Sequence, residues 1–180
     1  MKLDTLQRLY LNQLHELFYA EHQILKALPK MANAASSQAL RDGLETHIVQ
    51  TRGHIERLQH IFEERDEKPR ATTRQGIKGL IEDALDLLQH EADPSVLDAG
   101  IAVAAQKIEH YEIAIYSSLV AFADMLGYDK SVGVLQATLD EEAEVNELLE
   151  SLIQEVVTPE VLMETELGRS WSRSLSELLS

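Results

Sequence analysis

The chain has 180 residues, a formal net charge of −15, a pI near 4.8 and no cysteine. Its length suits one domain with a sizeable core. The acidic charge argues against nucleic acid and anionic membranes as partners, since both bind basic patches, and the lack of cysteine excludes disulfides and thiolate sites. Neither an apolar signal segment nor an uncharged span of about 18 residues is present, so we expect a cytoplasmic protein with no membrane partner.

Apolar residues recur at steps of three and four from the N-terminus onward, which predicts helices. We expect a first helix from about residue 4, with Asp4 as its N-cap, to Ala35. A second helix is expected over 38–64, capped by Ser36 or Ser37.

A polar linker of about a dozen residues follows, longer than most tight turns. A shorter amphipathic helix is then expected over about 77–90. Pro94 or Ser95 begins the next helix, which runs to about Leu126, and Gly127 supplies a turn. The last long helix is expected over about 130–156.

Four long helices joined by a short, a long and a short connection predict an all-α fold. The predicted architecture is a ferritin-like antiparallel four-helix bundle with an additional short helix in the long crossover. We assign residues 1–157 to this domain. Residues 158–180 are interpreted as a C-terminal tail that could dock as a short helix.

Polar side chains interrupt the apolar stripe near the middle of every long helix. An unpaired buried carboxylate costs several kcal/mol, so such groups must be exposed, neutralised or bound to something positive. Carboxylates and imidazoles from facing helices at one level of a bundle are the donors of a di-iron or di-manganese site. The candidate metal ligands are Glu21, His47, Gln50, His54, Glu109, Glu112 and Glu142.

The spacing of these residues is similar in the two hairpins. His54 follows Glu21 by 33 positions, and Glu142 follows Glu109 by 33 positions, which indicates a duplicated ligand-bearing hairpin. Pairing Glu21 with Gln50 and Glu112 with Glu142 instead gives separations of 29 and 30, which also nearly match each other, so spacing alone leaves the register open.

Each candidate also has an ordinary structural interpretation. Buried histidines are more often hydrogen-bonded core residues than ligands, and His47 and His54 lie two turns apart. We therefore expect one of them to orient a ligand rather than bind metal. The acidic run around Glu142 also suits a solvated face, and no Glu-x-x-His motif, usual in dimetal bundles, occurs in the chain.

Several segments resemble the YciE/YciF family of ferritin-like bacterial stress proteins over about residues 3–157. They are "LYLNQLHELFYAEHQILKALPKMANAA", "HIVQTRGHIERLQHIF", "AAQKIEHYEIAIYSSLVAFADMLGY" and "VLQATLDEEAE". The resemblance implies a dimeric, cytoplasmic, rubrerythrin-like four-helix bundle with a fifth helix, linked to stress responses.

The resemblance also implies a ligand set. The family's inward carboxylates map onto Glu21, Glu109, Glu112 and Glu142, and the histidine of its second helix maps onto His47. The family commonly has Glu where this chain has Gln50, and Gln where it has His54. The exchange replaces an acid by an amide and adds an imidazole one turn later.

These observations predict a dinuclear centre of iron or manganese in a homodimer, with Fe(II) oxidation or peroxide reduction as candidate reactions. One alternative is a metal-free helical dimer that serves as a structural or interaction module. Another is a storage subunit, which would require a 24-subunit shell. The metal, the substrate and any reaction stay open.

Overall fold

The protein is described by a computed structural model over residues 4–70 and 73–156. Within these ranges it consists of five α-helices and has no strand, which confirms the predicted all-α class. The helices are α1 (Leu6–Ala34), α2 (Gln38–Glu64), α3 (Gln75–Leu87), α4 (Pro94–Met125) and α5 (Asp129–Val156). None of these described helices is long and apolar enough to cross a membrane. The predicted tail, 158–180, lies outside the described residues.

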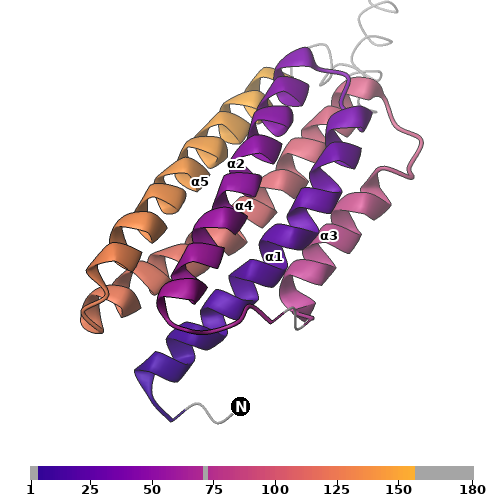
Figure 1. Cartoon of the computed structure of the whole chain (residues 1–180). Helices are drawn as coiled ribbons and strands as arrows, with labels where there is room; N and C mark the ends of the chain where they lie inside the picture. The colour runs from indigo at the N-terminus through magenta and orange to yellow at the C-terminus, as the bar shows by residue number, and fades with distance from the viewer. Residues whose placement is uncertain (1–3, 71–72, 157–180) are drawn as a thin grey trace, which may run out of the picture.

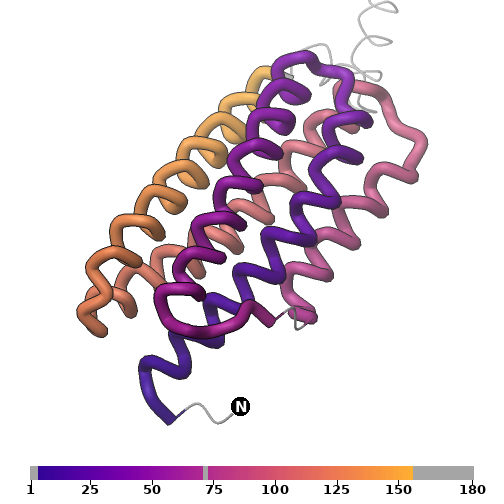
Figure 2. The backbone as a smooth tube through the Cα atoms, in the orientation of Figure 1, coloured from indigo at the N-terminus to yellow at the C-terminus, as the bar shows by residue number. Residues whose placement is uncertain are grey.

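Four long helices form a bundle, and the shorter α3 packs against α1 and α4 (Figure 1). One antiparallel hairpin is α1–α2 and the other is α4–α5, with α1 beside α4 and α2 beside α5. Because α2 and α4 run in the same direction, the chain must return along the bundle between them, and α3 makes most of this return (Figure 2). This single long crossover is the connectivity of ferritin-like bundles.

The helix ends confirm some predicted caps and correct others. Thr5, not Asp4, is the N-cap of α1, because Thr5 has the extended backbone and its hydroxyl accepts from the helix. Ser37 caps α2, and Asp93 caps α4 with Pro94 at the start of that helix. Gly127 has a φ of 69°, a left-handed conformation that glycine adopts without strain.

A buried aspartate fixes the level of α4 against the first hairpin. Asp98 accepts hydrogen bonds from the backbone N–H groups of Ser36 and Ser37, at 2.8 and 2.7 Å. These donors lie in the turn that begins α2, where N–H groups have no partner within the helix. The contact therefore ties the start of α4 to the α1–α2 turn and helps to set the register of the two hairpins.

The apolar core is divided into two clusters along the bundle axis. The first is built around Ile24, Leu28, Leu40, Ile101 and Leu149, and the second around Leu14, Leu58, Phe62, Tyr116 and Leu119. Between them, buried polar residues project from all four long helices. These residues, which we call the polar layer, are Glu21, His47, Thr51, His54, Glu109, Glu112 and Glu142.

Candidate metal centre

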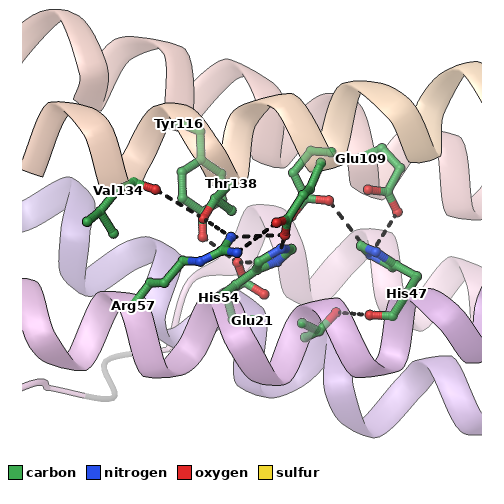
Figure 3. A network of polar contacts seen from close by, with 11 residues as sticks. Glu21, His47, His54, Arg57, Glu109, Tyr116, Val134 and Thr138 are labelled. Atoms are coloured by element: carbon green, nitrogen blue, oxygen red, sulfur yellow. Dashed lines mark hydrogen bonds and ion pairs between the residues drawn. The ribbon is translucent and has the colours of Figure 1, made fainter.

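The polar layer gathers six acidic or histidine side chains in the middle of the bundle. Helix α1 supplies Glu21, α2 supplies His47 and His54, α4 supplies Glu109 and Glu112, and α5 supplies Glu142. Each of them is at most 1% exposed. Their periodicity explains this, because residues three, four or seven apart lie on one face of a helix. Figure 3 shows the two histidines projecting from α2 toward the facing helices.

One group of candidate ligands centres on His47. It contains His47, Glu109, Glu112 and Glu142, and one donor atom from each lies within 4.8 Å of the others. The Nε2 atom of His47 is 3.3 Å from Glu109 Oε1 and 3.9 Å from Glu142 Oε2. These separations suit donors arranged around a common ion.

A second group centres on His54. Its members are Glu21, His54 and Glu142, again with one donor atom from each within 4.8 Å of the others. The Nδ1 atom of His54 lies 3.0 Å from Glu142 Oε1 and 3.5 Å from Glu21 Oε1. Tyr116 donates a short hydrogen bond from its hydroxyl to Glu21 Oε1, so one oxygen of Glu21 is fixed while Oε2 has no partner.

Glu142 belongs to both groups, and its two oxygens face different histidines. Oε1 approaches His54 and Oε2 approaches His47. The histidine ring centroids are 6.2 Å apart. The structure therefore does not divide the histidines into one inner and one outer residue, as the sequence suggested. Each histidine has its own group, and Glu142 is common to both.

Many of the converging atoms have no hydrogen-bond partner. Both oxygens of Glu112 and of Glu142 are buried without one, as are both ring nitrogens of His47 and Nδ1 of His54. The 3.0 Å approach of His54 Nδ1 to Glu142 Oε1 is thus close but lacks the direction of a hydrogen bond. Buried polar groups in folded proteins are normally paired. Donors that point at a shared space rather than at each other fit a bound metal pair.

The acidic members of the layer oppose each other electrostatically. Burial, together with repulsion from neighbouring carboxylates, raises the pKa of Glu109 and of Glu112 well above the usual 4.5. Burial also raises the pKa of Glu21, although His54 and Tyr116 partly offset this. In the metal-free protein, protons therefore neutralise part of the cluster.

The two histidines differ in charge. Burial lowers the pKa of His47, which keeps this ring neutral and able to accept a metal. Burial also acts to lower the pKa of His54, but the contacts with Glu142 and Glu21 outweigh it and raise the pKa to about 10. Burial would raise the pKa of Glu142, yet its contacts with His54 and His47 lower it. His54 and Glu142 thus form an ion pair when no metal is bound.

The sequence did not identify the outer edge of this site. Glu141 belongs to the acidic run around Glu142, which suits a solvated face, but its Oε2 is 2.8 Å from His54 Nε2. Arg57 holds the same carboxylate through two contacts, Nη2 to Oε1 at 2.7 Å and Nη1 to Oε2 at 2.9 Å. No local pattern marks this pair, because Arg57 and Glu141 come from α2 and α5 and meet only in the folded bundle.

Gln50 is the one candidate ligand that the structure keeps out of both groups. It lies beside His47 but is only partly buried, on a groove of about 440 Å³ between α2 and α5. Its Oε1 atom is buried without a partner. In the first hairpin, the contact between His54 and Glu21 selects the 33-residue pairing over the pairing with Gln50.

Comparisons with known proteins agree with the fold. The profile of DUF892, a domain of unknown function, matches residues 5–162. Protein YciF of Escherichia coli strain K12 is 36% identical over 143 residues, which are 79% of this chain and 86% of that protein.

Solved structures are similar as well. The crystal structure of the E. coli stress protein YciF has a TM-score of 0.83 at 35% identity, covering 86% of this chain and 98% of that one. YcfI from Rhodopseudomonas palustris, a proposed structural protein, has a TM-score of 0.80 at 41% identity, covering 83% and 97%. A protein from Xanthomonas campestris, at 19% identity and a TM-score of 0.66 with 85% and 94% covered, shares the fold.

Proposed function

The chain belongs to the DUF892 family, and from this starting point we propose that its polar layer is a dinuclear metal centre, of iron or manganese, in a bacterial stress protein. One ion would be held by His47, Glu109 and Glu112, and the other by Glu21 and His54, with Glu142 between them. Carboxylate and imidazole donors without thiolate suit these metals. The link to stress rests on the likeness to E. coli YciF.

The observation that carries this proposal is the orientation of Glu142. A carboxylate buried only for stability would accept hydrogen bonds, but both Glu142 oxygens lack them while facing two different histidines. The contact with His54 compensates the charge of Glu142, but a buried oxygen without a directed hydrogen bond still costs about 1–3 kcal/mol. Two cations, each beside one histidine, would account for both oxygens at once.

The protein's own part in any reaction would be to bind and to shield. When bound, a pair of redox-active ions would supply the one-electron steps needed to oxidise Fe(II) or reduce peroxide. Tyr116 holds Glu21 through its hydroxyl and so limits the orientations of that ligand. The two apolar clusters on either side of the layer exclude water from it.

Metal titration of the metal-free protein tests this function. With Mn(II), or Fe(II) without oxygen, calorimetry should give two ions per chain. Glu142→Ala should abolish both sites because this residue is shared, whereas Glu21→Gln should weaken one. Glu147→Gln, at an exposed position of α5, is the matched control and should bind like the unmodified protein. A protein that binds neither metal, or a Glu142→Ala variant with both sites intact, would refute the proposal.

The alternative is a metal-free structural module. It is favoured by the raised pKa values of Glu109 and Glu112, since protonated carboxyls can remain buried without a cation. Such a module should show no rise in melting temperature when Mn(II) or Fe(II) is added. A dinuclear protein should show a rise that grows with metal concentration.

We also propose that the protein is a homodimer. Two exposed apolar residues support this, Val49 at 65% and Leu148 at 43% exposed. Leu148 lines the α2–α5 groove, and Val49 is three residues from Thr46, which lines it too. Burying this face against a second copy would remove apolar surface from water.

A further inference from the structure

The ring of His54 is held from two opposite sides. Its Nδ1 atom faces the interior, 3.0 Å from Glu142 Oε1, and its Nε2 atom faces outward, 2.8 Å from Glu141 Oε2. The side chain of His54 is fully buried, whereas that of Glu141 is 28% exposed. The ring therefore connects the polar layer to a carboxylate at the edge of the bundle.

Glu141 is itself fixed by α2. Arg57 contacts both of its oxygens, and Nη1 of the same guanidinium donates to Thr138 Oγ1 at 3.0 Å. Two parallel contacts between a guanidinium and a carboxylate restrict orientation more than one contact does. Figure 3 shows Arg57, Thr138 and His54 close together at one side of the layer.

We propose that Glu141, clamped by Arg57, is a positioning residue that keeps Nδ1 of His54 directed at the metal pair. This inference rests on the proposed dinuclear site. Glu141 accepts the Nε2 proton and keeps it in place, so the proton that a metal displaces is the one on Nδ1, the nitrogen that faces Glu21 and Glu142.

The surroundings explain why such a residue is needed. When the His54 ring gives up one of its two protons, the carboxylates of Glu21 and Glu142 would draw the remaining proton to Nδ1, and a protonated Nδ1 cannot bind a metal. Glu141 competes for that proton from the opposite side of the ring. Histidines that bind metals commonly donate their other ring N–H to a carboxylate, and loss of that carboxylate lowers metal affinity about 10- to 100-fold.

Three variants, each of which removes a different part of the contact between Arg57, Glu141 and His54, test the inference. Glu141→Ala removes the acceptor, Glu141→Gln keeps an acceptor without charge, and Arg57→Met keeps Glu141 but removes its clamp. Calorimetry with Mn(II) should show about 10- to 100-fold weaker binding at one site in Glu141→Ala, with the second site unchanged. The losses in Glu141→Gln and Arg57→Met should be smaller, and Glu147→Gln should show none.

Nitrogen NMR of the His54 ring in the metal-free protein gives a readout independent of metal. The unmodified protein should show an Nε2–H signal protected from exchange with water, and this protection should be lost in Glu141→Ala and partly retained in Glu141→Gln. Equal Mn(II) affinity at both sites in Glu141→Ala would overturn the positioning role and leave the dinuclear site standing. If the unmodified protein binds neither Mn(II) nor Fe(II), the dinuclear proposal fails. An Nε2–H signal unchanged in Glu141→Ala would then overturn the positioning role separately. Should Glu141→Ala not fold, Arg57→Met decides by the same two readouts.

Discussion

Glu112→Gln should make the stability of the metal-free protein less dependent on pH. The folded-state pKa of Glu112 is raised well above 4.5 by burial and by the neighbouring carboxylates Glu21, Glu142 and Glu109. Above pH 4.5 the unfolded chain therefore releases a proton that the folded protein retains. The folded state binds more protons, so its free energy of unfolding falls as the pH rises.

The size of this effect follows from proton linkage. Each pH unit over which only the folded state keeps the proton lowers the free energy of unfolding by about 1.4 kcal/mol. From pH 5 to pH 7 this amounts to at most about 3 kcal/mol for one carboxyl group, the full amount applying if the folded state keeps the proton over the whole range. The glutamine that replaces Glu112 would have the shape of the protonated acid but no proton to lose. Its amide adds a cost of roughly 1–3 kcal/mol for unpaired donors, which is the same at every pH.

Urea denaturation of both metal-free proteins at several pH values measures this difference. The free energy of unfolding of Glu112→Gln, minus that of the unmodified protein, should rise between pH 5 and pH 7, by up to about 3 kcal/mol. Other groups, including His47, titrate in both proteins and largely cancel in the difference. Glu147→Gln should follow the unmodified protein. Parallel pH profiles for Glu112→Gln and the unmodified protein would refute the reasoning, because they would mean that Glu112 is ionised in the folded state.

Three further predictions concern the metal, the hairpins and the assembly. Metal binding should release protons from Glu109 and Glu112, so Mn(II) affinity should rise with pH, and calorimetric heats should differ between buffers of different ionisation enthalpy. Asp98→Ala should lower the free energy of unfolding by about 2–4 kcal/mol, because it leaves two backbone donors without their charged acceptor. Urea denaturation measures this change, and Asp98→Asn should lower the free energy of unfolding by less. Light scattering after size-exclusion chromatography should give the mass of a dimer, and Leu148→Glu should give that of a monomer; a monomeric unmodified protein would exclude the homodimer.

The fold could be predicted from the sequence because its determinants are local. Apolar periodicity gave α2 its observed limits, 38–64, and placed the starts and ends of the other helices within about three residues. The alternation of short and long connections then left few arrangements for four amphipathic helices. Only the identity of individual N-cap residues, such as Thr5 in place of Asp4, depends on backbone conformations that the sequence pattern does not determine.

The site could be predicted only in part, because the direction of each side chain decides whether the residue reaches the polar layer. Successive residues of an α-helix point about 100° apart, so Gln50 is turned about 60° from His47, whereas His54 is turned about 20°. The difference is enough to move Gln50 to the α2–α5 groove while His54 reaches Glu21. Spacing along a hairpin fixes the level of a residue but not this rotation.

Protons and divalent cations compete for the same buried carboxylates, and this competition links stability to metal. The protonated layer loses stability as the pH rises, by up to about 3 kcal/mol for one carboxyl over two pH units. A metal present at 100 times its dissociation constant adds about 2.7 kcal/mol for each site, and its affinity rises over the same pH range because the ligands are then more easily deprotonated. Bound metal keeps Glu109 and Glu112 deprotonated, so the folded state no longer retains protons that the unfolded chain releases, and the loss of stability with rising pH disappears. The free energy of unfolding of the metal-loaded protein should change little between pH 5 and pH 7, and a profile as steep as that of the metal-free protein would mean that the carboxylates of the layer are not metal ligands.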